Sequence, residues 1–264
     1  MKKHIISALK SIFHRLGFDI IRIKNSPKLT LCGLRSIPIQ TVIDVGANTG
    51  QFARQISQIF PQADLYCFEP LPEPFKALER WALGQDGRVK AFNVALGENE
   101  GTVEMLFHTK HSTSSSLLAS TVITKTYFPL TESQTPVGVM LTTLDSALSS
   151  AIPLLKPKIL VKLDVQGYEG RVIRGGSKTL NLATACVLEV NVDTLYYGQT
   201  NFKEVIILFD EMGFYYAGNL EQIYGSDGHV IYFDAVFVKK DNSSYVRKKD
   251  GTAIIQFTNS MSGS

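Results

Sequence analysis

The stretch TVIDVGANTG, residues 41–50, passes from an apolar run through Asp44 into a turn that contains Gly46 and Gly50. The next ten residues, QFARQISQIF, have the spacing of an amphipathic helix, and Pro61 stops it. A buried strand that turns through glycines into a helix is typical of the ligand-binding edge of an open α/β sheet. The stretch therefore predicts both a fold class and the place where a cofactor binds.

Strands and helices continue to alternate after this loop. Further strands are predicted over residues 63–70, 89–96, 158–165, 185–192 and 229–240, and helices over residues 73–83, 168–180 and 201–214. Short links between them imply right-handed crossovers and a doubly wound, mostly parallel sheet. With 264 residues, of which 44% are hydrophobic and 19% charged, the chain suits one large α/β domain with a substantial core.

Three segments flank or interrupt this domain. We expect residues 1–37 to form an extension with an amphipathic helix and a strand, residues 38–240 the main domain, and residues 241–264 a polar tail. The segment GTVEMLFHT, residues 101–109, alternates like an added edge strand or hairpin. The Ser- and Thr-rich insert at 109–136 is too long for an ordinary connection, so it is expected to be either disordered or a lid.

The charges are placed unevenly along the chain. Residues 1–28 carry a net charge of +6 and residues 239–250 a net charge of +3, so the total of +3 leaves −6 on the body between them. An acidic body argues against a broad nucleic-acid surface. The three cysteines form no CxxC pair and no metal-ligand pattern, which favours a reducing, cytoplasmic location.

The first residues, MKKHIISALKSIFHRLGFDII, predict an amphipathic helix that ends at Gly17. Its apolar positions recur at helical spacing: Ile5, Ile6, Leu9, Ile12, Phe13 and Leu16. The apolar run is too short for a membrane span or a signal peptide. Two uses stay open: the helix packs on its own domain or on a second subunit of a homo-oligomer, or residues 1–24 lie on a membrane surface.

Acidic residues end three of the predicted strands: Asp44, Glu69 and Asp164. The carboxyl ends of parallel strands meet at one edge of a sheet, and buried carboxylates there need partners. A dinucleotide favours the loop pattern GxGxxG, whereas Asn48 here replaces the second glycine, and Asp44 would repel a pyrophosphate. S-adenosylmethionine has no phosphate, carries an ammonium and a sulfonium, and offers a ribose diol to Glu69. The pattern therefore favours S-adenosylmethionine over NAD(P).

Five motifs together resemble the FkbM family of S-adenosylmethionine-dependent methyltransferases: VIDVGANTGQFA, CFEPLPEPFKALE, NVALGENEGTVEM, VKLDVQGYEGRVIRGG and VLEVNVDTLYYG. They occur in order within residues 38–240. The resemblance implies a class I methyltransferase (Rossmann-like) fold with an antiparallel C-terminal strand. It also implies S-adenosylmethionine as the cofactor and O-methylation, often of a sugar or polyketide hydroxyl.

The resemblance also assigns cofactor contacts by position. The amino-acid end of the cofactor is expected to bind the first loop: Asp44, Gly46, Ala47, Asn48 and Gly50. Glu69 is expected to bind the ribose. The adenine is expected to lie along Asn93, Val94 and Ala95. Asp164 borders the methyl group and the acceptor. Gln166 stands where many relatives carry Glu, so a role that depends on charge is missing at that position.

A sugar hydroxyl has a high pKa, so a general base should assist methyl transfer. The candidates are Asp164, Glu189, His111 and Glu169, each with a structural alternative: hydrogen bonding for Asp164 and Glu189, an exposed loop position for His111 and a helix cap for Glu169. Glu169 is expected to cap the following helix. Asp164 and Glu189 could also bind a divalent cation, although no pattern requires a metal. Aromatic side chains that could line the acceptor site are Tyr168, Tyr196 and Tyr197.

The expected partner is a small-molecule or saccharide acceptor, and no nucleic acid. Two other functions stay open at this point. One is an NAD(P)-dependent oxidoreductase on the same kind of sheet. The other is a non-catalytic module that binds a partner or a membrane through the N-terminal helix.

Overall fold

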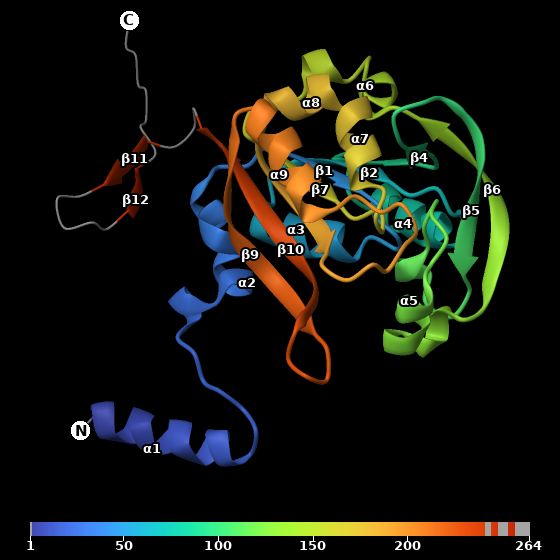
Figure 1. The fold of residues 1–264 in the computed structure, drawn as a ribbon. Coiled ribbons are helices and arrows are strands. Elements are labelled where there is room, and N and C mark those ends of the chain that lie inside the picture. Colours follow the sequence, from blue (N-terminus) through green and yellow to red (C-terminus); the bar gives the residue numbers. More distant parts are fainter. Residues whose placement is uncertain (1, 241–243, 248–252, 257–264) are drawn as a thin grey trace, which may run out of the picture.

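The computed structural model describes residues 2–240, 244–247 and 253–256. Its centre is a seven-stranded sheet in the order β3-β2-β1-β7-β8-β10-β9 (Figure 1). The strands are β1 (Thr41–Val45), β2 (Asp64–Phe68), β3 (Val89–Phe92), β7 (Ile159–Leu163), β8 (Ala183–Asn191), β9 (Phe214–Tyr224) and β10 (Val230–Lys239). Neighbouring strands from β3 to β8 are parallel, whereas β10 is antiparallel to β8 and β9. The predicted mostly parallel sheet with an antiparallel C-terminal strand is confirmed.

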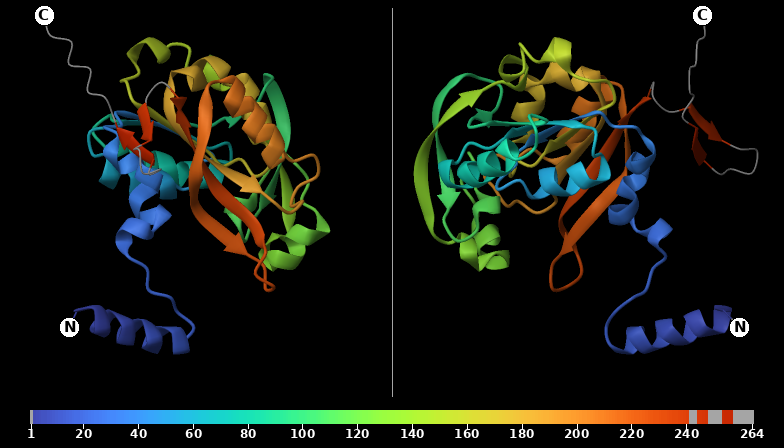
Figure 2. Two further views of the ribbon diagram at one scale, coloured as in Figure 1. Left: turned by 60° about the vertical axis from the view of Figure 1, so that its left-hand side comes forward. Right: turned by 180° about the vertical axis from the view of Figure 1, so that it is seen from behind.

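Helices cover both faces of this sheet (Figure 2). One face packs against η2 (Leu31–Ser36), α3 (Gln51–Ile59) and α4 (Pro72–Leu83). The other packs against α6 (Leu144–Ala147), α7 (Glu169–Gly175), α8 (Ser177–Leu182) and α9 (Phe202–Glu211). Successive side chains of a strand point to opposite faces, so Val42 lies in one layer of the core and Ile43 in the other. The continuous apolar runs of β1 and β7 therefore belong to a sheet that is buried on both sides.

A second, three-stranded sheet stands beside the first and contains the added hairpin. It has the order β4-β6-β5, formed by β4 (Ala95–Leu96), β5 (Gly101–His108) and β6 (Gln134–Thr142). The strand predicted over 89–96 is thus divided between the two sheets. The insert forms η3 (Ser112–Ser114), α5 (Val122–Tyr127) and η4 (Pro129–Thr131) before it enters β6. Ser114, Ser115 and Ser116 are buried, so the Ser-rich run packs against the domain.

The strand expected within residues 1–37 is wrong for the described part of that extension. Residues 2–37 form α1 (Lys2–Arg15), η1 (Ile23–Asn25), α2 (Pro27–Thr30) and η2. Ser26 accepts a hydrogen bond from the Leu29 N–H, and Pro27 occupies the first turn, a combination that starts a helix. The predicted N-terminal helix is confirmed as α1, and Gly17 follows it with φ +81°.

Three further elements differ from the predicted ones. The helix expected over 168–180 is broken into α7 and α8 at Gly176, whose φ of −118° and ψ of 17° depart from helical geometry. Strand β9 was not predicted, since Gly218 and shifts in register interrupt its alternation. Part of the expected polar tail forms a hairpin of β11 (Ser244–Arg247) and β12 (Ala253–Gln256), while residues 257–264 lie outside the described residues.

Candidate active site

The loop after β1 has a backbone that explains its residue types. Gly46 has φ +80°, and a Cβ there would lie 1.8 Å from the Asp164 carbonyl oxygen, so the loop passes directly against the end of β7. Asn48 has φ +47°, a left-handed conformation that Asn tolerates better than most residues. Its Oδ1 accepts a hydrogen bond from the Thr49 N–H at 2.9 Å, and its Nδ2 donates to Ser112 Oγ at 3.1 Å. Asn48 therefore keeps the glycine-like turn and adds polar contacts.

Glu69 follows β2 and holds this loop in place. One carboxylate oxygen accepts from the Asn48 N–H and the other from the Leu71 N–H, both at 2.8 Å. The residue is only 4% exposed. Burial raises the pKa of Glu69 to about 7, although the two N–H donors oppose that shift. The buried carboxyl group of Glu69 thus joins the loop after β1 to the end of β2.

A cavity of about 300 Å³ lies where β1, β2 and β7 end. The predicted cofactor residues that line it are Gly46, Ala47, Asn48, Glu69, Val94, Ala95 and Asp164. Its other walls include the apolar side chains of Phe68, Leu96, Met105 and Leu117. Apolar walls suit a nucleobase, while the two carboxylates suit a ribose diol and a cationic centre. The lining therefore fits S-adenosylmethionine better than a pyrophosphate.

Two other predicted cofactor residues, Gly50 and Asn93, lie behind this lining. Gly50 packs beside Leu78, and Asn93 donates hydrogen bonds to the carbonyl oxygens of Glu69 and Pro70 at 2.9 and 3.0 Å. Both support the walls of the cavity from outside it.

Asp44 lies one layer beneath the cavity. It is fully buried, and neither carboxylate oxygen has a hydrogen-bond partner. Lys162 is its partner in the β1–β7 register. Burial raises the pKa of Asp44 to about 6, while the charge of Lys162 opposes the shift. Asp44 does not line the cavity, so any influence of its carboxyl group on the cavity is electrostatic.

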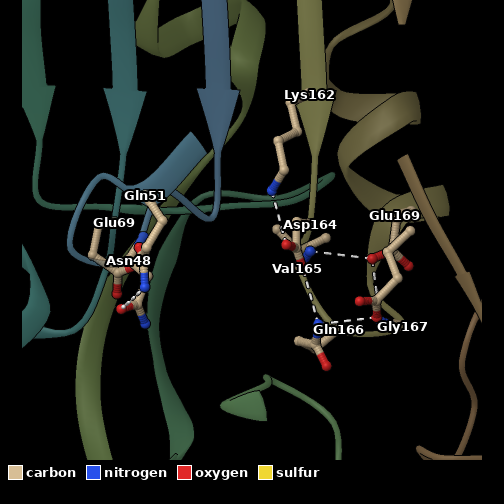
Figure 3. A network of polar contacts seen from close by, with 10 residues as sticks. Asn48, Gln51, Glu69, Lys162, Asp164, Val165, Gln166, Gly167 and Glu169 are labelled. Carbon is tan, nitrogen blue, oxygen red and sulfur yellow. Dashed lines mark hydrogen bonds and ion pairs between the residues drawn. The ribbon is translucent and has the colours of Figure 1, made fainter. Parts of the chain in front are cut away.

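Side chains from three segments meet around the end of β7: Lys162, Asp164 and Gln166, which Figure 3 shows, together with Glu189 and Tyr196. Lys162 donates to Asp164 Oδ2 at 2.8 Å. Gln166 Nε2 donates to both Asp164 Oδ1 and Glu189 Oε1, at 2.8 and 2.9 Å. Gln166 Oε1 accepts from the Tyr196 hydroxyl at 2.6 Å. Both N–H donors of the amide are thus used, and its carbonyl oxygen binds the Tyr196 hydroxyl.

A second cavity of about 160 Å³ adjoins the first on the far side of Asp164. Thr113, Asp164 and Gln166 line both cavities. The three predicted catalytic residues all line the second one: Asp164, Glu189 and His111. The insert brings His111 there, where Nδ1 lies 2.8 Å from Ser114 Oγ and the ring stacks on Phe128. Residues far apart in the sequence are thereby collected around one small space.

The charges around the second cavity are strongly coupled. Burial raises the pKa of Glu189 well above its usual range, and the nearby Asp164 adds to the shift. Burial alone would lower the pKa of Lys162, but Asp164 and Asp44 outweigh it and raise the pKa. Burial therefore favours the protonated form of Glu189, while the two nearby carboxylates favour the charged form of Lys162, which pairs with Asp164.

The remaining predicted residues divide between structural and lining positions. Glu169 accepts hydrogen bonds from the N–H groups of Val165 and Gly167, so it fixes the loop before α7. Tyr168 lines the first cavity, and the buried Tyr196 lines the second. Tyr197 is 60% exposed and lines neither of these cavities.

Sequence analysis missed two contributors to the site. Lys162 stands two residues before Asp164 in β7, so strand alternation alone places both on one face. The bridging role of Gln166 had no signal in the sequence, because it depends on Glu189 and Tyr196 from other segments. Among the residues that the structure describes, no group of three or more His, Cys, Asp or Glu is arranged to hold a metal.

Comparison with known proteins identifies the family. Residues 44–216 match the model of the methyltransferase FkbM domain. The chain is 32% identical over 219 residues to 2-O-methyltransferase NoeI of Sinorhizobium fredii (strain NBRC 101917 / NGR234), covering 79% of this chain and 87% of that protein. It is 27% identical over 143 residues to Methyltransferase 1 of Beauveria bassiana (strain ARSEF 2860), covering 51% and 57%.

A solved structure, methyltransferase FkbM from Methylobacillus flagellatus KT, matches with a TM-score of 0.45 and 10% identity over 76% of this chain and 44% of that chain. The sequence comparisons favour neither a dinucleotide-dependent oxidoreductase nor a non-catalytic module. The chain belongs to the FkbM methyltransferase family and is an S-adenosylmethionine-dependent methyltransferase.

Proposed function

We propose that the protein transfers a methyl group from S-adenosylmethionine to a hydroxyl of a saccharide or a related small molecule. The observation that carries this proposal is the second cavity, which adjoins the cofactor cavity and shares Asp164 with it. A carboxylate at the junction is suited to deprotonate a hydroxyl. The relative NoeI is a 2-O-methyltransferase, which supports transfer to oxygen.

In this proposal the first cavity holds the cofactor. The loop Gly46, Ala47 and Asn48 binds its amino-acid end, Glu69 binds the ribose, and Val94 and Ala95 lie along the adenine. Gly50, Asn93 and Asp44 act indirectly, by shaping the loop and setting its charge. When bound, S-adenosylmethionine supplies a methyl group on a positively charged sulfur.

Asp164 is the proposed general base, and it accepts the proton that the acceptor hydroxyl loses on methylation. Lys162 and Gln166 each donate a hydrogen bond to one of its oxygens, at 2.8 Å. These contacts hold the carboxylate at the boundary of the two cavities. Such fixed geometry matters because methyl transfer needs close alignment of the reacting atoms.

Glu189 and His111 bind the acceptor in this proposal. Burial raises the pKa of Glu189 and so favours its protonated form, which can donate a hydrogen bond to an acceptor oxygen. His111 comes from the insert on the opposite wall, together with the polar Thr113 and Ser114. A small cavity with several hydrogen-bonding groups and the aromatic rings of Tyr196 and Tyr232 suits a sugar ring.

The test is transfer of a labelled methyl group from S-adenosylmethionine to a panel of monosaccharides and oligosaccharides, with the product position assigned by NMR. We expect an O-methyl product, and Asp164→Asn should lower kcat by about 10²–10⁴-fold, the usual contribution of a general base. Asp210→Asn is the matched control, since Asp210 is an exposed residue on α9. Label that enters only amines would refute the acceptor, and full activity in Asp164→Asn would refute the base.

A further inference from the structure

Helix α1 stands apart from the methyltransferase domain (Figures 1 and 2). The first firm attachments of the extension come later, at Lys28, which pairs with Glu221 at 2.6 Å, and at Cys32, whose Sγ donates to the Asn219 carbonyl oxygen. Ile12 is 56% exposed and Leu16 is 65% exposed. The helix therefore does not pack on its own domain, which was one of the two uses that the sequence left open.

The described side chains of α1 divide into an apolar and a polar side. At about 100° per residue, the positions of Ile6, Leu9, Ile12 and Phe13 fall within one stripe, and the exposed Leu16 follows directly after the helix. Lys10 borders the stripe on one side and Arg15 on the other, while Ser7, Ser11 and His14 take the opposite side. Every apolar member of the stripe is exposed. An apolar stripe with basic borders is the pattern of a helix that lies in a lipid interface.

The apolar surface continues beyond the helix. Phe18, Ile21 and Ile23 are also exposed, in the link between α1 and α2. The same segment carries most of the positive charge, because residues 1–28 have a net charge of +6. No helix in the described ranges is long and apolar enough to cross a membrane. A lipid contact through this segment would therefore be parallel to the surface.

Charge favours lipid over a second copy of the chain as the occupant of the stripe. Two α1 helices packed together would bring two segments of +6 into contact, whereas anionic headgroups attract this charge. The acidic body, with −6, is repelled by the same headgroups. The charge distribution thus draws the extension toward an anionic surface and keeps the domain facing away from it.

We infer that residues 2–24 bind in the plane of an anionic phospholipid surface and hold the methyltransferase domain beside it. The apolar stripe of α1 enters the acyl boundary, and Lys10 and Arg15 lie at the headgroups. Because it depends only on the extension, this inference stands apart from the choice of acceptor.

The test is flotation of the full chain with vesicles of phosphatidylcholine alone or with about one-third phosphatidylglycerol. Ile12→Asp places a charge in the apolar stripe, and Ser11→Asp places the same charge on the adjacent polar position as the matched control. We expect binding to the anionic vesicles that weakens at high salt, and a loss of about tenfold or more in Ile12→Asp, as removal of one buried isoleucine implies. Ser11→Asp should lose about fivefold or less, from charge alone.

Circular dichroism checks that both variants stay folded. Equal binding by Ile12→Asp and Ser11→Asp would overturn the inference, as would the absence of vesicle binding by the unaltered chain. Sedimentation equilibrium tests whether the stripe instead binds a second copy of the chain. That would be shown by an unaltered chain that is dimeric and does not bind vesicles, with a dimer that dissociates in Ile12→Asp but not in Ser11→Asp. Failure of methyl transfer to saccharides would leave the flotation result unaffected, so the two proposals are tested separately.

Discussion

Replacing Gln166 by Glu tests whether a neutral bridging amide organises the two carboxylates. The change removes two N–H donors and places a third carboxyl group 2.8 and 2.9 Å from the oxygens of Asp164 and Glu189. Two like charges at 4 Å repel by about 4 kcal/mol at an effective dielectric constant of about 20, which equals about three pKa units. The new group should therefore retain a proton near pH 7.

A protonated carboxyl group has one O–H donor, whereas the amide has two N–H donors. One of the two carboxyl neighbours therefore no longer receives a hydrogen bond from residue 166, and if that neighbour is the charged Asp164, the loss costs about 1.5–3 kcal/mol. If Asp164 is the base and loses its orientation, kcat should fall by about 10- to 150-fold. The loss should grow as the pH rises above about 7, because release of the extra proton adds repulsion.

The assay measures kcat and KM for methyl transfer from pH 6 to 9, together with the Kd of S-adenosylhomocysteine by calorimetry. Gln58→Glu is the control, because Gln58 is exposed on α3 and the charge change is the same. We expect Gln166→Glu to lower kcat more than it changes KM, and its pH profile to show a new ionisation near neutral pH. Identical kcat and pH profiles in the two variants would refute the bridging role.

Three further predictions follow from the cofactor cavity and its supports. Gly46→Ala should abolish measurable binding of S-adenosylhomocysteine in calorimetry, because its Cβ would meet a backbone oxygen at 1.8 Å, while Gly138→Ala, with no atom within 4 Å, should bind normally. Tyr196→Phe should lower the free energy of unfolding by about 1–3 kcal/mol in urea titrations, since a buried hydroxyl and its acceptors lose their hydrogen bond. Burial raises the pKa of Glu69 from 4.5 to about 7, so its protonated form stabilises the cofactor-free fold below pH 4.5, and this contribution is lost as the pH rises through about 7. The free energy of unfolding should thus fall by about 3 kcal/mol between pH 5 and 8, and Glu69→Gln should show a smaller fall in the same titration.

The sequence was sufficient where local pattern and backbone geometry agree. The strand, glycine turn and helix at residues 41–59 follow from apolar periodicity and two glycines, and the structure has β1 and α3 there. The acids predicted at the ends of β1, β2 and β7 also lie at one edge of the sheet, because the carboxyl ends of parallel strands meet there. Prediction was weaker where regularity breaks: β9 has shifts in register, and β4 joins a second sheet two residues after β3 ends.

The division of labour among the acids could not be predicted from the chain alone. Asp44, Glu69 and Asp164 look alike in sequence, as acids at strand ends, but only the folded chain makes Asp44 unpartnered, Glu69 a backbone acceptor and Asp164 an ion-pair partner. The difference arises because each is surrounded by atoms from distant segments. His111 illustrates the same limit, since the packing of the insert decides whether a loop histidine reaches the cavity.

By itself, the sequence determined the class of sheet, the edge at which the cofactor binds and the family, because these depend on periodicity, glycine positions and short motifs. Only the tertiary structure decided that Gln166 joins Asp164 to Glu189, that a second cavity shares its wall with the first, and that α1 stands clear of the domain. Each of these depends on contacts between residues that are far apart in the chain, and hydrogen-bond geometry and burial are set only when those residues meet.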